Sequence, residues 1–395
     1  MKMDSRETGY FHGKIISGWQ NVPPDLPPSA VTVGNFDGVH RGHQRILEKA
    51  VERAHGIEGI SIAFTFDPHP LRFLNPMGGP PLLTTWTQKA HWIQAAGIDL
   101  LVCAAFDEAM LSLSPRQFLQ EVLLSRLKMR EIIEGPGFTF GTGRSGTVET
   151  LCALGEELGF GVTILEPVTE GQEIITSTRI RELLCEGAVE QAAQFLGRPY
   201  SLEGSVVDGQ RRGRTLGFPT ANLDPENELI PRTGVYAVLV EHQSHPYPGV
   251  TNVGYSPTFE ARGLTVETHI LDFQREIYGQ EISLHFIQRL RSELKFSGPE
   301  ELIRQMERDV QEARKAFKMI ETEQRLMEIL REAIEKEKDS QAHFQQGAAV
   351  ATNPEIREMF LQLMAEEKQH EQILRKRYIE VKKRLGLKLM ESEDS

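Results

Sequence analysis

The sequence predicts a multidomain protein in which an α/β Rossmann-like domain is followed by an antiparallel β-barrel and an all-α helical hairpin. Three observations lead to this prediction. Apolar runs alternate with helical stretches in the first half, and short strand-like runs divided by Gly and Pro turns follow. From Gly298 onward the chain is rich in Glu, Lys, Gln and Leu, as expected for helices. A length of 395 residues allows two or three domains.

The composition excludes several classes of protein. A net charge of −12 argues against a general nucleic-acid binder, which needs a basic surface. The three cysteines show no CxxC spacing, so we expect neither a disulfide framework nor a thiolate metal site. No apolar run approaches the roughly 20 residues of a membrane span, and the first residues lack a signal core. We therefore expect a cytoplasmic enzyme without a membrane or nucleic-acid partner.

Alternating patterns predict the first domain, residues 1–185. Apolar runs at Ile60–Phe66 and Asp99–Phe106 are separated by helical stretches such as Pro115–Leu127. This alternation is typical of βαβ units on a parallel sheet.

The predicted second domain, residues 186–317, has a different pattern. Its strand-like runs at Gly234–Glu241, Val266–Phe273 and Glu281–Leu290 are divided by Gly and Pro turns, which favours an antiparallel barrel. Residues 318–395 form the predicted helical tail. One break is expected at Thr352–Glu355, where Asn353 can cap a helix and Pro354 takes its first position.

The stretch VGNFDGVHRGHQRIL, Val33 to Leu47, joins a predicted strand to a predicted helix. Its glycines Gly34, Gly38 and Gly42 let the backbone approach a ligand, and the following helix offers free N–H groups to a phosphate. His40 and His43, one turn apart, can point at one anion. The spacing is not that of a P-loop. The simpler alternative is a glycine-rich turn with two surface histidines.

A second stretch, IITSTRIREL, spans Ile174 to Leu183. Its hydroxyl and cationic side chains suit a triphosphate: Thr176, Ser177, Thr178, Arg179 and Arg181. Taken alone, the segment also fits an ordinary capped amphipathic helix.

These motifs carry a resemblance to a known family. HxGH after a first strand resembles the nucleotidyltransferase superfamily, and together with IITSTRIREL and FTFDPHP (Phe64–Pro70) it looks like the adenylylating module of the bacterial bifunctional riboflavin kinase/FAD synthetase. RRGRTLGFPTANL (Arg211–Leu223), GVTNVGYSPTF (Gly249–Phe259) and VETHILDF (Val266–Phe273) resemble the riboflavin kinase motifs in their order. The resemblance spans roughly Thr32 to Phe317.

The resemblance implies two ATP-dependent reactions: phosphorylation of riboflavin to FMN, and adenylylation of FMN to FAD. In the kinase domain it assigns Thr220 and Asn222 to Mg²⁺ and the ATP phosphates, and Glu267 to the catalytic base; Gly217 belongs to the nucleotide site. Oxygen ligands of this kind suit a hard cation.

In the nucleotidyltransferase domain the resemblance implies that His40, His43 and Arg181 stabilise charge on the phosphates. It places the remaining nucleotide contacts at Gly34, Asn35, Asp37, Gly42, Ser177, Thr178 and Arg179. It assigns the flavin contacts to Phe138, Phe140 and Arg144. One departure is Gly137, where many relatives carry Asp or Asn.

The tail beyond Phe317 is not explained by this family. Its first helix carries Glu337 in an apolar stripe, and its second carries Glu367 and His370 between Leu363 and Leu374. Such groups are costly to bury unless they are paired or metal-bound. One Glu followed by Glu-x-x-His on the next helix is half of a ferritin-like di-iron site, and the stretch resembles rubrerythrin.

A half-site per chain implies a homodimer through the tail, holding iron or another transition metal. His343 and Glu366 are neighbouring alternatives as ligands. Two other interpretations stay open: a metal-free oligomerisation or docking hairpin, and an iron-storage or peroxidase module fused to a flavin enzyme.

Overall fold

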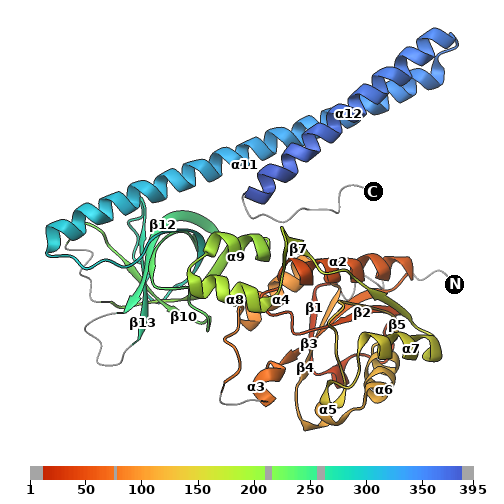
Figure 1. Cartoon of the computed structure of the whole chain (residues 1–395), viewed down its shortest axis with the longest axis horizontal. Helices are drawn as coiled ribbons and strands as arrows, with labels where there is room; N and C mark the ends of the chain where they lie inside the picture. Colours follow the sequence, from red (N-terminus) through yellow and green to blue (C-terminus); the bar gives the residue numbers. More distant parts are fainter. Residues whose placement is uncertain (1–11, 75–77, 210–215, 256–262, 385–395) are drawn as a thin grey trace. The chain divides into compact units, whose positions relative to one another are not determined.

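The computed structural model describes residues 12–74, 78–209, 216–255 and 263–384. Two motif segments, 211–215 and 256–259, lie outside these described residues. The chain divides into two compact units: residues 1–182 with 226–230, and residues 183–225 with 231–395. Each unit is described separately below (Figure 1).

The first unit is built on a six-stranded parallel sheet. Its strands are, in spatial order, β1 (Lys14–Ser17), β4 (Leu100–Ala105), β3 (Ile60–Asp67), β2 (Ser29–Val33), β5 (Met129–Glu134) and β6 (Gly161–Ile164). The strand order reverses at β2, since β3 and β4 lie on one side of it and β5 and β6 on the other. In such sheets ligands bind at the carboxyl ends of the strands beside this reversal.

Helices and short elements connect these strands. The longer helices are α2 (Arg41–Gly56), α4 (Trp86–Ala95), the π-helix η2 (Phe118–Arg126) and α7 (Val148–Leu158). The shorter elements are η1 (Trp19–Asn21), α3 (Pro70–Leu74), α5 (Glu108–Ser112), α6 (Pro115–Gln117), η3 (Thr142–Arg144), and the strand pair β7 (Thr169–Glu170) and β8 (Glu173–Ile174). Helix α8 (Ser177–Glu186) begins in the first unit and ends in the second.

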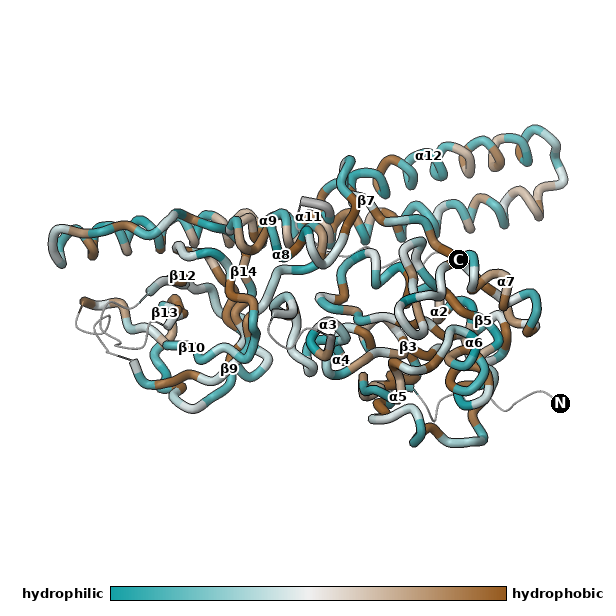
Figure 2. Tube along the Cα trace, turned by 60° about the horizontal axis from the view of Figure 1, so that its bottom comes forward, coloured by the Kyte–Doolittle hydropathy of each residue, from teal (hydrophilic) through white to brown (hydrophobic). Residues whose placement is uncertain are grey.

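The sheet is buried on both faces, and successive residues of each strand point to opposite sides. On β2, Ala30 packs with Leu47 of α2 and Ile93 of α4, whereas Val31 packs with Leu119 of η2 and Leu151 of α7. Continuous apolar strands are the pattern of a parallel sheet between two helical layers. The hydropathy colours of Figure 2 show these strands as largely hydrophobic.

The second unit contains a closed antiparallel barrel. Its strands, in order around the barrel, are β10 (Ala221–Pro225), β13 (Leu264–Ile270), β12 (His245–Tyr255), β11 (Gly234–His242), β14 (Glu281–Arg291) and β9 (Tyr200–Val207). Helix α9 (Val189–Leu196) packs beside β14 and β9. Alternate residues of β9 are buried, and the rings of Tyr236 and Phe286 meet edge to face at 5.2 Å. The interior is therefore filled by side chains.

Two long helices complete the second unit: α11 (Pro299–Val350) and α12 (Pro354–Arg384). The first part of α11 packs Ala313 and Phe317 against Ala237 of the barrel. The helix then continues without a break into the hairpin with α12, so residue 317 lies inside a helix. At the turn, the Asn353 side chain accepts hydrogen bonds from the N–H groups of Glu355 (2.8 Å) and Ile356 (3.4 Å), and Pro354 opens α12 as predicted.

The three predicted architectures are thus confirmed: a parallel α/β domain, an antiparallel barrel and a helical hairpin. Within the described ranges, no helix has both the length and the apolar character needed to span a bilayer.

Candidate active sites and metal centre

The turn after β2 has an unusual backbone. Phe36 (φ +48°), Gly38 (φ +80°) and Val39 (φ +38°) all have positive φ. A branched residue such as Val39 rarely adopts this conformation, and strain of this kind gathers at functional sites. The turn lies at the carboxyl end of β2, where the strand order reverses. It is therefore placed where this sheet type binds ligands.

His40 and His43 are brought together at the start of α2. His40 is the N-cap of the helix, and its Nδ1 accepts from the N–H of His43 at 3.3 Å. The two rings stack with centroids 3.7 Å apart. A side-chain carbon on Gly42 would approach the His40 ring at 3.1 Å, so glycine leaves this ring its space.

His43 is held in its neutral form. Burial lowers its pKa well below the usual value, and the positive charges of His40 and Lys89 act in the same direction. Its Nδ1 is buried and has no hydrogen-bond partner among the described residues. A neutral imidazole at a helix start can donate one hydrogen bond to a phosphate oxygen.

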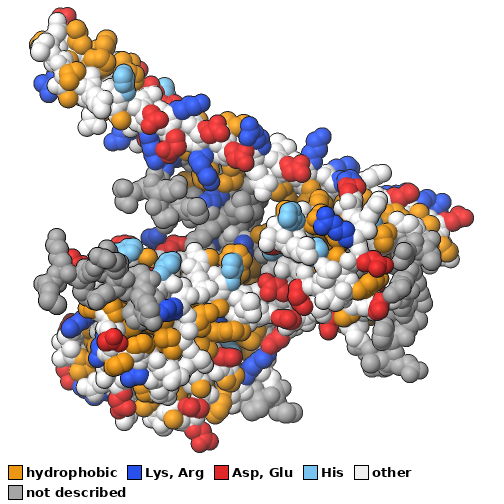
Figure 3. All heavy atoms as spheres, turned by 180° about the vertical axis from the view of Figure 1, so that it is seen from behind, with side chains coloured by type: hydrophobic (Ala, Val, Ile, Leu, Met, Phe, Trp, Pro, Cys, Tyr) orange, Lys and Arg blue, Asp and Glu red, His pale blue; other side chains and the backbone are white. Residues whose placement is uncertain are grey.

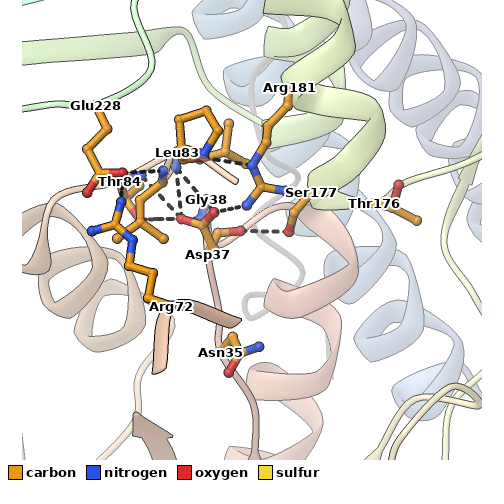
Figure 4. Close-up of polar contacts among 12 residues, drawn as sticks. Asn35, Asp37, Gly38, Arg72, Leu83, Thr84, Thr176, Ser177, Arg181 and Glu228 are labelled. Atoms are coloured by element: carbon orange, nitrogen blue, oxygen red, sulfur yellow. Dashed lines mark hydrogen bonds and ion pairs between the residues drawn. The ribbon is translucent and has the colours of Figure 1, made fainter. Parts of the chain in front are cut away.

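Asp37 organises the residues around this turn (Figure 4). Its buried carboxylate accepts from the N–H groups of Leu83 (2.9 Å) and Thr84 (3.3 Å) and pairs with Arg181 of α8. Its backbone carbonyl accepts from the Ser177 hydroxyl at 2.9 Å. Asp37 thus joins the turn after β2 to two distant segments, and its carboxylate accepts hydrogen bonds from within the protein.

The side chains at the start of α8 that were predicted to bind a triphosphate lie in different environments. The guanidinium of Arg181 also donates to the carbonyl of Pro81 at 2.8 Å, so it is largely engaged within the protein. Arg179 pairs with Glu173 and Glu182, each at 3.3 Å. Thr176 and Thr178 are exposed, and Asn35 lies apart from the Asp37 contacts in Figure 4.

Sequence reasoning missed Glu134, at the end of β5. Its buried carboxyl accepts from the N–H of Val33 at 2.7 Å, which joins the ends of β5 and β2. Burial raises its pKa well above the usual value, against the effect of that hydrogen bond. The strand Met129–Glu134 contains two acidic residues, Glu131 and Glu134, and its sequence does not show that Glu134 is the buried one.

The residues expected to contact flavin in the first unit have different environments. The rings of Phe138 and Phe140 stack 5.2 Å apart, but Phe140 belongs to the buried core. Arg144 is exposed and donates to the Thr139 hydroxyl at 2.9 Å. A side chain at Gly137 would meet no atom within 4 Å, so its position opens to free space.

In the second unit, the predicted kinase residues meet on neighbouring strands. Asn222 of β10 and Glu267 of β13 are direct partners in the antiparallel register, and Asn252 of β12 lies opposite Glu267 on its other side. All three line a cavity of about 330 Å³. A side-chain carbon at Gly209 would lie 2.0 Å from the Asn222 amide, so a larger residue there would displace the Asn222 side chain.

Thr220 lies between two hollows of the barrel unit. It lines the cavity that contains Glu267 and also a neighbouring cavity of about 390 Å³, whose walls include Ile270, Phe273 and Tyr278. Gly217, shortly before it, has φ +86° and supports the turn into β10. A side chain in this place can face ligands in both hollows.

Helix α11 supplies one wall of the cavity that contains Glu267. Leu302, Met306 and Val310 provide apolar surface, and Asp309 forms a buried pair with Arg291 at 2.7 Å. Gln305 donates to the same carboxylate at 2.9 Å. An apolar wall with a few fixed polar groups is typical of a site for a planar organic ligand.

The tail brings Glu337, Glu367 and His370 together within one chain. One ligand atom of each lies within 4.8 Å of the others. The Nδ1 of His370 is 3.1 Å from a carboxylate oxygen of Glu367 and 4.0 Å from one of Glu337. The neighbouring Glu367 carboxylate raises the pKa of Glu337. Two carboxylates and one imidazole this close are a donor set that fits a transition-metal ion.

The FAD synthetase family profile matches residues 22–179, and the riboflavin kinase profile matches residues 196–317. The bifunctional riboflavin kinase/FMN adenylyltransferase of Buchnera aphidicola is 34% identical over 311 residues, covering 78% of this chain and all of that protein. The enzyme of the same name from Bacillus subtilis is 39% identical, covering 75% of this chain and 95% of the relative. The chain belongs to the bifunctional riboflavin kinase/FMN adenylyltransferase family.

The chain is a transferase that phosphorylates riboflavin to FMN and adenylylates FMN to FAD, with ATP as the second substrate. A crystal structure described as a macrolide-efflux protein from Streptococcus pneumoniae is also similar. It has a TM-score of 0.71 and 30% identity, covering 76% of this chain and 98% of that one.

The tail of this enzyme matches a different family. The rubrerythrin profile matches residues 287–378, which include all three clustered ligands and overlap the end of the kinase match. The overlap, residues 287–317, begins at the end of β14 and continues into α11, the helix that passes from the barrel into the hairpin. The expected resemblance to rubrerythrin is thereby confirmed, and it extends further toward the barrel than residue 318.

Proposed function

We propose that the two reactions occur at separate sites, riboflavin phosphorylation on the barrel and FMN adenylylation at the turn after β2. The observation that carries this proposal is that the two motif sets lie in different compact units. We accordingly assign residues 1–185 to adenylylation, 186–317 to the kinase and 318–395 to the tail. We place both reactions in the cytoplasm, because both consume ATP.

In the kinase, Glu267 acts as the base that accepts the proton of the riboflavin 5′-hydroxyl as this oxygen attacks the γ-phosphate of ATP. The flavin ring occupies the cavity walled by α11, and Thr220 faces the phosphates from between the two hollows. Thr220 and Asn222 hold Mg²⁺, whose charge neutralises the phosphates when it is bound; their side-chain oxygens are donors that this ion prefers.

The test is product analysis of Glu267→Gln. This substitution keeps the shape and a hydrogen-bond acceptor but removes the base, so FMN formation should fall about 10²–10⁴-fold. Conversion of FMN to FAD should stay near the wild-type rate, because it occurs in the other unit. A parallel loss of both activities in a folded variant would show that the sites are not separate.

At the turn after β2, the phosphate of FMN attacks the α-phosphate of ATP and pyrophosphate leaves. The N–H groups that open α2, together with His40 and His43, stabilise the charge that builds on the phosphates. Asn35, Ser177, Thr178 and Arg179 border the same nucleotide site, and Gly34 and Gly42 let the backbone come close. Arg181 acts mainly by holding Asp37, since these two are already paired. Phe138 and Arg144 are the proposed flavin contacts, and Phe140 supports Phe138 from the core.

For the tail, we propose a metal site shared by two copies of the chain. Glu337, Glu367 and His370 hold one ion per chain, most simply iron, and the second copy completes a pair. The redox-active ion would give the tail an electron-transfer chemistry that the kinase and adenylyltransferase do not need. Half a bundle per chain leaves the site incomplete without a partner.

The surface of α12 supports this pairing. One seam of the helix faces α11: Phe360, Met364, Glu367, Glu371, Leu374 and Tyr378. A second seam repeats at the spacing of three and four residues typical of helix pairing: Ile356, Met359, Leu363, Glu366, His370 and Ile373. Ile356, Met359 and Ile373 on this second seam are 46%, 49% and 54% exposed. Charged and apolar side chains intermingle along the hairpin in Figure 3.

A chelator experiment tests the link between metal and assembly. Bound metal favours whichever state contains the completed site. Iron removal from the full-length protein should therefore shift its sedimentation toward the monomer, and iron addition should restore the dimer. A molar mass that is the same with and without iron would support the alternative of a metal-free oligomerisation or docking hairpin.

A further inference from the structure

Lys89, in α4 of the first unit, is a charged residue that the reactions described so far do not use. It is only 4% exposed. Among the described residues, no acceptor lies within hydrogen-bond or salt-bridge distance of its ammonium group; its recorded side-chain contact is the Trp86 ring, 6.0 Å from Nζ. An ammonium group buried without a partner is costly, so an unpaired one needs a reason.

The segment that carries Lys89 is fixed to the turn after β2. The N–H groups of Leu83 and Thr84 bind the Asp37 carboxylate, and Thr85 then caps α4. The ammonium group lies within electrostatic range of Asp37, and its positive charge lowers the pKa of His43. Lys89 is thus held beside the paired histidines at the carboxyl ends of the parallel strands.

The acidic groups near Lys89 are accounted for in other ways. Asp37 is already satisfied by Leu83, Thr84 and Arg181. Asp67 is exposed to water. Burial raises the pKa of the Cys103 thiol to about 11, so this sulfur is not a counter-anion at neutral pH. Over the described ranges, no anionic group therefore pairs with this buried positive charge, which leaves it available to an anion from outside the chain.

We propose that the ammonium group of Lys89 contacts a phosphate group of the reactants in FMN adenylylation. This inference rests on the proposed location of that reaction at the His40 turn. A bond forms between an FMN phosphate oxygen and the α-phosphorus, and the bond from that phosphorus to the bridging oxygen breaks. The electron pair leaves with pyrophosphate. No proton has to move, so a fixed cation is sufficient to stabilise the charge.

A lysine suits this task because its ammonium group is a compact point charge that follows a moving phosphate. The helix start at His40 and His43 offers hydrogen bonds from one side of the turn. Lys89, reaching the same region from α4, adds a full charge with little exposure to water, where a charge acts most strongly.

Replacement of Lys89 by Met separates a role in the reaction from a role in folding. Methionine keeps the apolar stem and removes the charge, and replacing a buried charge by an apolar group is often neutral or stabilising. We expect Lys89→Met to fold with an unchanged or higher melting temperature and an unchanged rate of riboflavin phosphorylation. Its kcat for FMN adenylylation should fall about 10²–10³-fold, as for loss of one oxyanion-stabilising donor. The inhibition constant of pyrophosphate should rise at least about tenfold, because the contact between the ammonium group and a phosphate is lost.

Two matched variants serve as controls. Lys89→Arg keeps the charge and should retain part of the adenylylation rate. Lys49→Gln removes a lysine of α2 that pairs with Glu52 on the surface, and it should behave as the wild type. Lys89→Met protein that is folded and adenylylates FMN within about twofold of the wild-type rate would overturn the proposal. If Lys89→Met does not fold, Lys89→Arg provides the test. A Lys89→Arg variant that loses inhibition by pyrophosphate but keeps the full rate of adenylylation would overturn the proposal equally.

His43→Ala distinguishes this inference from the function on which it rests. If His43→Ala slows adenylylation and Lys89→Met does not, only the role of Lys89 is wrong. If His43→Ala leaves adenylylation unchanged, the location of the reaction at the turn is wrong as well.

Discussion

The Nδ1 of His370 lies 3.1 Å from a carboxylate oxygen of Glu367, which precedes it by one turn on α12. Glu337 reaches the same point from α11, and its pKa is raised beside Glu367. Like charges this close are unfavourable in an isolated hairpin, and a bound cation would relieve the repulsion. The tail therefore resembles rubrerythrin in the placement of these side chains as well as in sequence. This placement leads to a prediction about assembly.

Ile373→Lys should weaken dimer formation. Ile373 is 54% exposed on the second seam of α12, beside His370 in the same repeat but outside the ligand cluster. A lysine there places charge in the proposed interface, whereas the equally charged Gln372→Lys should have little effect because that residue lies off both seams. Sedimentation of the two iron-loaded variants provides the measurement. Equal dimer populations in both would show that the second seam is not the interface.

The buried pair of Arg291 and Asp309 should be worth more than the surface pair of Arg314 and Asp272. Asp309→Ala leaves a largely buried guanidinium uncompensated, which we expect to cost about 3–5 kcal/mol. Arg314→Ala breaks a pair whose members are 51% and 74% exposed, and it should cost less than about 1 kcal/mol. Urea unfolding of the barrel unit measures both. Asp309→Ala should also weaken riboflavin binding, because both members of its pair line the cavity.

Acid should destabilise the first unit partly through His43. Its pKa in the folded state is lowered by burial, so below the usual pKa of about 6.5 the unfolded chain binds a proton that the folded chain does not. The stability of the unit should therefore fall as the pH drops below that value, by at most about 1.4 kcal/mol per pH unit for this group. In His43→Gln this part of the slope should vanish. Chemical unfolding of both proteins at pH 7 and pH 5 gives the comparison, and identical slopes would remove His43 as the cause.

Much of the site was accessible from the sequence because it is encoded locally. The spacing of His40 and His43 at a glycine-rich helix start predicted two rings that act together, and they stack in the structure. The helical period also predicted that Glu337, Glu367 and His370 meet. Glu267, in contrast, could be selected only through the family resemblance, since one acidic residue on an alternating strand carries no local signal.

The contacts that sequence reasoning missed depend on long-range topology. Glu134 matters because β5 lies beside β2, and Asp37 is engaged because residues 83–84 and Arg181 fold back onto it. No local pattern reveals such pairings. The continuity of α11 through Phe317, in contrast, follows from the local pattern: the chain from Gly298 onward was predicted to be helical up to the break at Thr352–Glu355, and no proline interrupts the helix after Pro299.

The most direct test of the metal-binding tail combines elemental analysis and sedimentation for the wild type and for Glu367→Ala/His370→Ala. The wild type, loaded with iron under anaerobic conditions, should contain two irons per dimer, and the double variant should lose the metal and the dimer while it keeps riboflavin kinase activity. Glu358→Ala, an exposed glutamate of the same helix, should match the wild type. A metal-free, monomeric wild type after iron loading would contradict the proposal and leave a plain helical hairpin.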